Sequence, residues 1–420
     1  MLFLELSPIY LAANVYFIYE ILKWVDALKR TAKSRHIPTR LIKAILATLF
    51  GISTLAIYIA FLMPNDLNKV SEPFLYELRR TLKLIGNYHL GIDIYLGIAF
   101  VVVWIARLFE MQYWKKKGIT TRRERIARYF SKRRSILGLC VFGFIVFVVL
   151  YGSYEARNIK VSKYEISVDK NAGDIKELNV VMLADLHMGY NIESDLIQKT
   201  AELVNKENPD IVLIVGDLYD NEYEALDDPE AIIEALGSMK SKYGTYAVYG
   251  NHDIDEKIIG GFTFNGDDGT KGSSDLMDEL LQRSNINLLH DEYVLIDDSF
   301  YLYGRPDYAR IGKWADSRLT PSECVENLDS SKPIIVMDHE PRELQELADA
   351  GVDVDFCGHT HDGQFFPLTI ISRVFLWENS AGYLKKDNMH NIVTSGVGLF
   401  GPNMRVGSDA EICSIKIRFN

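Results

Sequence analysis

The stretch Gly358-His359-Thr360-His361 sets two imidazoles two residues apart, directly after an apolar run, residues 352–357, that is typical of a buried strand. Four other short clusters carry the same residue types, and each also follows an apolar, strand-like run. They are Asp185-Leu186-His187, Gly216-Asp217, Gly250-Asn251-His252-Asp253 and Met337-Asp338-His339. Because open sheets place their sites beyond the ends of their strands, we expect the five clusters to meet at one edge of a sheet.

These side chains are the ligands that divalent transition metals take in proteins. Asp185 and His187 alternate by two, so at a strand end they should face the same side and grip one ion. Asp217 follows a glycine that lets the backbone turn sharply, and its two oxygens can bridge two ions. An amide oxygen and three imidazoles complete the predicted ligand set: Asn251, His339, His359 and His361.

Two ions about 3.5–4 Å apart can hold a hydroxide between them and clamp a phosphoryl group for in-line attack. Mn²⁺, Zn²⁺ and Fe are the predicted ions, because imidazole ligands do not suit Mg²⁺ or Ca²⁺. His252 lies next to a predicted ligand without being needed as one, so it can donate to the phosphate or protonate the leaving oxygen. Each cluster alone could arise by chance, and the joint occurrence of five favours the two-metal site.

The chain from residue 155 onward alternates strand-like runs with amphipathic helical patterns. Strands are predicted at residues 180–184, 211–215, 246–249, 334–337, 352–357, 391–395 and 412–419, the last two as paired strands. Helices are predicted at 194–206, 229–240, 274–283 and 342–350. Alternation followed by more strand indicates helices that flank two packed sheets.

The five clusters resemble the ordered blocks of the calcineurin-like metallophosphoesterases, which read D-x-H, G-D, G-N-H-[DE], a lone His and G-H-x-H. All five stand in this order between residues 178 and 419. The resemblance implies a four-layer α/β/β/α sandwich with two metal ions. It implies two ligand sets that share one carboxylate: Asp185, His187, Asp217 and His361 for one ion, and Asp217, Asn251, His339 and His359 for the other.

The resemblance also implies catalytic roles. His252 would be the catalytic histidine, and Asp220 matches the carboxylate that orients this histidine in related phosphatases. His339-Glu340-Pro341 and the ending at residues 393–398 look like a bacterial, membrane-associated branch of the family. Asp362 stands where that branch usually has Gly, which puts an additional carboxylate beside the predicted metals.

Residues 1–155 follow a different pattern, in which apolar spans alternate with basic loops. Four spans approach the length that crosses a bilayer core: residues 3–22, 41–63, 90–109 and 136–152. This part holds 22 Lys and Arg against 10 Asp and Glu, whereas the remainder holds 24 against 47. We therefore predict a membrane domain at 1–155 and the phosphoesterase domain at 156–420. The acidic second domain argues against nucleic acid as a partner.

The basic loop at residues 110–135, which includes Lys115-Lys116-Lys117, predicts the orientation. Loops rich in Lys and Arg stay in the cytoplasm. We therefore expect a multi-pass protein of the cell membrane with both ends outside and the catalytic domain on the extracytoplasmic face.

The leading hypothesis is a membrane-anchored phosphoesterase, a hydrolase that attacks phosphomono- or phosphodiesters with the metal-bridging hydroxide. The apolar stretch at residues 365–377 adjoins the site, so it could touch the lipid bilayer or cover a lipid-linked or envelope substrate; a loop packed on the sandwich is the other interpretation. A non-catalytic sensor or binding module that retains the fold is the alternative, against which the intact ligand set argues. A transporter is disfavoured, because the spans are few and carry no paired charges.

Overall fold

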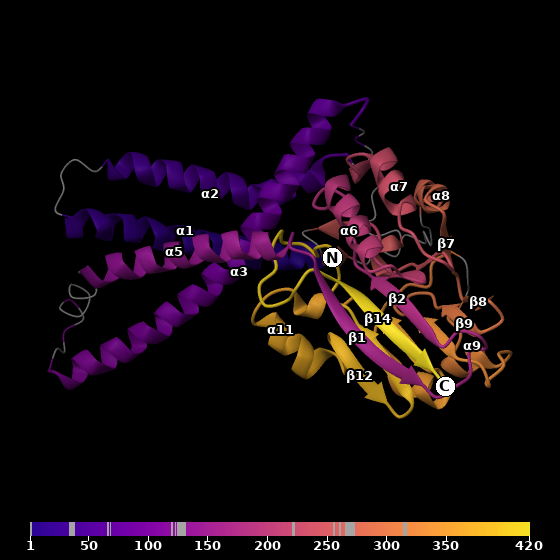
Figure 1. Ribbon diagram of the computed structural model, residues 1–420. Coiled ribbons are helices and arrows are strands. Elements are labelled where there is room, and N and C mark those ends of the chain that lie inside the picture. The colour runs from indigo at the N-terminus through magenta and orange to yellow at the C-terminus, as the bar shows by residue number, and fades with distance from the viewer. Residues whose placement is uncertain are drawn as a thin grey trace. The chain divides into compact units, whose positions relative to one another are not determined.

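The computed structural model of the protein describes residues 2–32, 38–64, 67, 69–118, 121, 123, 132–220, 223–254, 257–259, 262–264, 274–313 and 317–420. The chain forms two compact units. The helical unit comprises Met1–Pro64 and Leu78–Tyr151, and the sheet unit comprises Asn65–Glu77 and Gly152–Asn420. Figure 1 shows long helices in the first and two sheets with flanking helices in the second.

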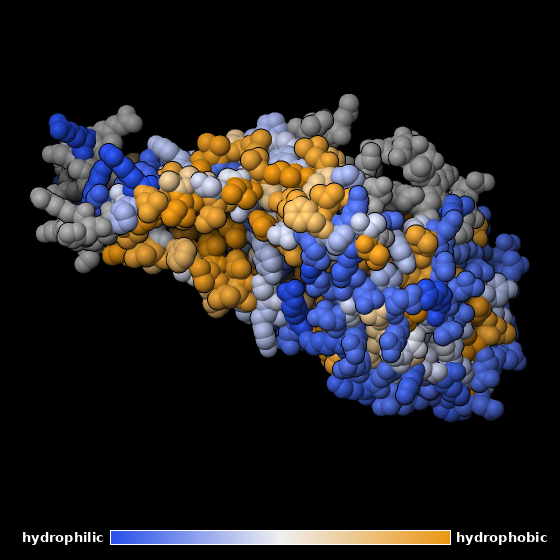
Figure 2. Space-filling model, turned by 90° about the horizontal axis from the view of Figure 1, so that it is seen from above, coloured by the Kyte–Doolittle hydropathy of each residue, from blue (hydrophilic) through white to orange (hydrophobic). Residues whose placement is uncertain are grey.

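The helical unit is built from α1 (Leu2–Ala32), α2 (Thr39–Leu62), α3 (Pro73–Lys116) and α5 (Lys132–Glu155). Among the described residues, three helical stretches are long and apolar enough to cross a membrane: Thr39–Leu62, Pro73–Lys116 and Arg133–Glu155. They contain three of the four predicted spans, and apolar side chains cover much of this unit's visible surface (Figure 2). The fourth predicted span, residues 3–22, lies in α1, which is helical but is not one of the three.

Polar side chains of α1 find partners inside the helical unit. The amide nitrogen of Asn14 donates to Asp93 Oδ2 at 2.8 Å, and its amide oxygen accepts from Thr54 Oγ1 at 3.1 Å. His89 Nε2 lies 2.9 Å from the same oxygen. A polar group without a partner in hydrocarbon costs several kcal/mol, so these contacts favour the packing of α1 against apolar helices.

Glu20 of α1 is also paired, with Arg107 at 3.0 Å and with Arg134 at 2.9 Å. The expectation that the apolar spans carry no paired charges is therefore wrong, since Glu20 and Arg107 both lie within predicted spans. A pair between helices distant in sequence leaves no local pattern, because each member reads as a single tolerated charge.

The sheet unit holds two six-stranded sheets. The order in the first is β1 (Lys160–Val168), β14 (Glu411–Phe419), β2 (Glu177–Leu183), β3 (Ile211–Val215), β4 (Thr245–Val248) and β7 (Ile286–Leu288). The order in the second is β12 (Gly382–Lys386), β13 (Met389–Val393), β11 (Val354–Cys357), β10 (Ile334–Met337), β9 (Phe300–Gly304) and β8 (Glu292–Ile296). The strands that precede the five clusters run parallel within each sheet, which brings their carboxyl ends together. A separate hairpin pairs β5 (Lys257–Ile259) with β6 (Phe262–Phe264).

Helices cover the outer face of each sheet. The first sheet is covered by α6 (Ser194–Lys206), α7 (Pro229–Gly237) and α8 (Asp275–Arg283) (Figure 1). The second is covered by α9 (Pro321–Val325) and α10 (Leu344–Asp349). Shorter helical turns complete the unit: η1 (Tyr223–Ala225), η2 (Asn251–Asp253), η3 (His361–Gly363), α11 (Leu368–Ile371) and η4 (Ser372–Leu376). The predicted α/β/β/α sandwich is therefore confirmed.

Strand β2 shows how the sequence builds these layers. Val180 and Met182 point into the core between the two sheets, whereas Val181 and Leu183 point into the core under the helices. Successive side chains of a strand face opposite sides, so a strand buried on both faces must be apolar throughout. This is why the continuous apolar runs predicted the central strands well.

Predicted elements agree best where the apolar pattern is strong. The strands at 211–215 and 334–337 and the helix at 194–206 have the predicted bounds, while α7 ends three residues earlier than predicted. The edge strands β1, β7, β8 and β12 were not predicted, and neither was the interior strand β9 of the second sheet. The two tail strands do not pair with each other, because β13 joins the second sheet and β14 the first.

Asp355 on β11 generates a prediction about pH. Its Oδ2 accepts from Asn391 Nδ2 at 2.9 Å, and burial raises its pKa to about 7. The unfolded chain ionises this group near pH 4, so stability should fall by about 1.4 kcal/mol per pH unit between about pH 4 and 7 and stay low above. We expect Asp355→Asn to raise the unfolding temperature of the detergent-solubilised chain more at pH 8 than at pH 5. The exposed Asp174→Asn is the control, and an equal shift at both pH values would contradict the prediction.

Candidate metal centre

The five clusters meet at the carboxyl ends of strands from both sheets. Strands β2, β3 and β4 of the first sheet are followed by the clusters of Asp185, Asp217 and Asn251. Strands β10 and β11 of the second sheet are followed by those of His339 and His359. The expectation of a single sheet edge is therefore wrong, since the site lies where the ends of two facing sheets converge.

Left-handed backbone aims the side chains into the site. The φ angles are 54° at Asp185, 47° at His187, 50° at Asp217, 69° at His359 and 47° at His361. Asp185 and His187 therefore converge through tight turns beyond the end of β2, and not by strand alternation as predicted. Residues other than glycine rarely adopt this left-handed conformation. Such strained positions cluster at functional sites.

Two glycines allow the backbone segments to approach. A Cβ atom on Gly216 would lie 2.2 Å from the His339 ring, and one on Gly250 would lie 2.3 Å from Asp217 Oδ1. Gly216 also has a φ of +89°. The glycine before Asp217 thus supplies the predicted turn and, in addition, the space that His339 needs.

The structure groups six of the predicted ligands into two sets: Asp185 with His187 and His361, and Asp217 with His339 and His359. In the first set His187 Nε2 lies 3.0 Å from His361 Nε2, which lies 3.5 Å from Asp185 Oδ1. In the second, His339 Nε2 lies 3.2 Å from His359 Nδ1 and 3.1 Å from Asp217 Oδ2. Asp217 Oδ2 is also 3.7 Å from His187 Nε2, so this carboxylate lies between the sets.

Asn251 provides a test of whether a metal fits. Its amide oxygen is buried and, in the part of the chain that the structure describes, has no hydrogen-bond partner. A buried acceptor without a donor is costly, and a cation would satisfy it. With the converging imidazole nitrogens and carboxylates, this donor set suits two divalent transition metals.

Charge in the site is set by burial and by the carboxylates. Burial alone would raise the pKa of Asp217, but the facing imidazoles, above all His339, hold it well below its usual value. Burial lowers the pKa of His359 to about 3 and holds that of His361 well below its usual range, so both rings are neutral at pH 7. A neutral imidazole is the form that coordinates a metal. The facing carboxylates outweigh burial at the other two rings and raise the pKa of His187 to about 9 and that of His339 well above its usual value, so a metal would displace their protons.

Hydrogen bonds behind the ligands fix their rings. His187 Nδ1 lies 2.8 Å from Asp220 Oδ1, which leaves Nε2 facing the site. His339 Nδ1 donates to the Val215 carbonyl at 2.9 Å, with the same result. Metal-binding histidines commonly use the second nitrogen in this way.

The hydrogen bond of Asp220 goes to a different histidine from the one expected, and its role beside His252 stays a prediction. Asp220 was expected to orient His252, but its hydrogen bond goes to His187. His252 Nδ1 is buried and has no hydrogen-bond partner among the described residues. The side chains of Asp220, His187 and His252 lie close together, so spacing alone could not identify the partner.

Two supporting residues were not predicted. Arg405 is fully buried, and its guanidinium lies 3.3 Å from His361 Nδ1 and donates to the carbonyls of Ser395 and Gly398. Asp253 accepts from the backbone N–H of Gly250 at 2.8 Å and of Tyr219 at 2.9 Å, which fixes the loop that carries Asn251. Asp253 belongs to the cluster Gly250-Asn251-His252-Asp253, whereas nothing in the sequence around Arg405 marks its role.

Asp362, the additional carboxylate expected beside the metals, is engaged elsewhere. Arg373 Nε donates to Asp362 Oδ1 at 2.8 Å, and Arg373 Nη2 contacts Oδ2. Asp362 belongs to neither ligand set. It ties η4 to the loop that carries His361.

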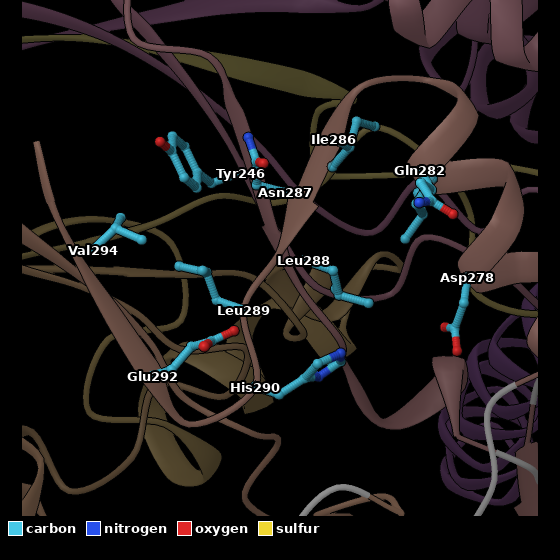
Figure 3. Close-up of a pocket in the computed structure, with 11 residues that line it drawn as sticks. Tyr246, Asp278, Gln282, Ile286, Asn287, Leu288, Leu289, His290, Glu292 and Val294 are labelled. Carbon is cyan, nitrogen blue, oxygen red and sulfur yellow. The ribbon is translucent and has the colours of Figure 1, made fainter.

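A separate hollow of about 540 Å³ opens beside β7 and β8, lined by residues that include Tyr246, Asp278, His290 and Glu292 (Figure 3). None of the predicted ligands lines it. The hollow is therefore a separate site from the candidate metal ligands.

The chain is similar to several known proteins. Residues 178–363 match the family model of the calcineurin-like phosphoesterases. A transmembrane protein with metallophosphoesterase domain from Danio rerio is 30% identical over 300 residues, which cover 69% of this chain and 63% of that protein. An uncharacterized metallophosphoesterase of Helicobacter pylori is 28% identical over 75% of this chain and 80% of its own length. A solved dimetal phosphatase from Danio rerio matches 52% of this chain and 87% of its own at 13% identity, with a TM-score of 0.32.

The hydrogen bond from His187 to Asp220 generates a second prediction. Asp220→Asn should weaken metal binding by about 10–100-fold, because the acceptor that sets the tautomer of His187 becomes a neutral amide. Metal content after dialysis against graded chelator concentrations measures this. Asp195→Asn, an exposed change on α6, is the control. If Asp220→Asn kept its metal but lost turnover, Asp220 would return to the predicted role beside His252.

Proposed function

We propose that this chain, in which residues 178–363 belong to the calcineurin-like phosphoesterase family, is a membrane-anchored hydrolase of phosphomono- or phosphodiesters that works with two divalent metal ions. The observation that carries the proposal is the pair of ligand sets joined by Asp217, with His252 beside them. Structural scaffolds have no need of so many buried, convergent metal-type side chains.

Seven residues would hold the ions: Asp185, His187, Asp217, Asn251, His339, His359 and His361. Mn²⁺, Zn²⁺ and Fe suit this donor set, since most of the ligands are imidazoles. When bound, two such ions supply an activated water and polarise the phosphoryl oxygens. The chain's own contribution is to hold the ligands on short turns whose backbone is fixed by both sheets.

His252 would donate a proton to the leaving oxygen. Its backbone N–H donates to Asp217 Oδ1 at 2.8 Å, and its ring packs edge-on against His187 and Phe400. Burial lowers the pKa of His252 to about 4, and a negatively charged phosphate ester favours the protonated ring. The ring is therefore positioned by packing and is left free to exchange a proton with substrate.

His252→Ala tests this division of roles. We expect turnover of p-nitrophenyl phosphate or its bis-ester to fall by about 10²–10⁴, while metal content stays that of the parent protein. His359→Ala is the matched comparison, because it should lose metal and activity together. If His252→Ala loses metal as completely as His359→Ala, then His252 is a ligand and the assignment is wrong.

The non-catalytic alternative predicts a different result in the same assay. A sensor that retains the fold would turn over neither ester at any metal loading. Turnover that Asp217→Asn abolishes would exclude that alternative.

We further propose that the helical unit is multi-pass and that the sheet unit lies on the extracytoplasmic face. The support is the basic loop at residues 110–135, of which 119, 120, 122 and 124–131 lie outside the described residues, and the paired polar groups of α1, which favour a fourth pass. A reporter enzyme that needs an oxidising environment, fused after Asn420, should therefore be active. A fusion at this position that works only with a cytoplasmic reporter would overturn the orientation.

A further inference from the structure

We propose that residues 366–376, here called the docking segment, insert into the surface of the lipid bilayer and select substrates whose phosphate ester is carried on a lipid anchor. The segment comprises the end of the loop after η3, then α11 and η4. The inference rests on the proposed function and names its substrate class.

The docking segment exposes its large apolar side chains and buries two small polar ones. Val374, Phe375 and Leu376 are 63%, 76% and 64% exposed. Four further large apolar side chains of the segment are also exposed: Phe366, Leu368, Ile370 and Ile371. Thr369 and Ser372 are buried instead. A helix on a water-facing surface shows the opposite pattern, with polar side chains outside and apolar ones inside. An exposed apolar patch of this kind marks a binding surface.

Internal contacts hold the segment in this orientation. Ser372 Oγ lies 2.6 Å from Ser380 Oγ, and Arg373 is paired with the buried Asp362. The polar residues are therefore used to fix the turn to the sandwich. The apolar side chains point outward because the segment is anchored on its other side.

A membrane-spanning helix ends close to the docking segment within the sheet unit. The backbone N–H of Arg405 donates to the carbonyl of Gly152, in the last turn of α5, at 3.0 Å. The next residue, Val406, accepts from the N–H of Phe366 at 2.7 Å. Two hydrogen bonds and one peptide therefore connect Gly152, the residue at which the chain passes from α5 into the sheet unit, to the first apolar residue of the segment. A lipid surface is the partner that this connection provides.

Charge at the edge of the segment also suits a bilayer. The side chains of Arg373 and Arg342 are 59% and 46% exposed, although each is paired with an acid. Apolar side chains flanked by cations are typical of segments that lie in the headgroup region and attract anionic lipids.

The residue that follows the docking segment contacts a predicted metal ligand. Trp377 follows η4, and its ring meets that of His359 edge-on at 5.3 Å. The Arg342 guanidinium lies 4.7 Å from the centre of the same indole. A phosphate ester anchored in the bilayer would therefore pass an indole and a cation on its way to the ligands.

Fluorescence quenching tests the docking. The full chain carrying Cys140→Ala and Phe375→Cys is labelled with a polarity-sensitive dye and reconstituted into phosphatidylethanolamine–phosphatidylglycerol vesicles with brominated acyl chains. We expect quenching at least about twofold greater than for Leu276→Cys, another exposed apolar site, on α8. Equal quenching at the two positions would overturn the docking. It would also be overturned if the dye at Phe375→Cys reported an apolar environment only when a second copy of the chain or another protein is bound, and not in vesicles.

A matched pair of esters tests the substrate class. Methyl and hexadecyl p-nitrophenyl phosphate share one reacting group and differ only in the chain. We expect kcat/KM for the hexadecyl ester in vesicles to be about tenfold higher, and Val374→Ser with Phe375→Ser to remove that preference while the methyl ester is hydrolysed as before. Equal rates for both esters in the parent protein would overturn the substrate class. Hydrolysis of neither ester, nor of p-nitrophenyl phosphate, would count against the proposed function, whereas the quenching result decides the docking on its own.

Discussion

The buried carboxylate of Asp217 is the interaction on which the site depends. Its Oδ2 lies between His339 Nε2 and His187 Nε2, and its Oδ1 accepts from the backbone of His252. Burying a carboxylate away from water costs free energy unless positive charges or hydrogen-bond donors surround it. Here those groups come from the ends of three different strands. The two sheets must therefore be correctly aligned before this charge is tolerable, so the geometry of the sandwich and that of the metal centre are set together.

The glycines and the left-handed residues belong to the same constraint. Gly216 and Gly250 leave no room for a Cβ atom, since the His339 ring and the Asp217 carboxylate occupy that space. Positive φ angles at the ligands cost energy that regular strands would not. The apolar cores on both faces of the first sheet provide the stability that offsets this strain.

The central strands and the ligands could be predicted because their signals are local. A run such as residues 211–215 is apolar on both faces, and Asp217 follows it within two residues. The assignment of β13 and β14 to different sheets, the contact of Asp220 with His187 and the support of His361 by Arg405 could not be predicted in this way. Each depends on which distant segments meet in space, and the alternatives have almost the same sequence spacing. The pairing of Asn14 and Glu20 in the helical unit was missed for the same reason.

The position of β14 has a consequence for how the protein is made. The first sheet has the order β1-β14-β2, so the strand at Glu411–Phe419 lies between two strands that are consecutive in the chain. During synthesis β1 and β2 emerge more than 200 residues before their common neighbour. Until β14 is present, β1 lacks the strand that joins it to β2 and the first sheet is incomplete. A nascent chain therefore holds an incomplete first sheet, and the layer that carries Asp185, Asp217 and Asn251 is complete only when the whole sheet unit has been synthesised.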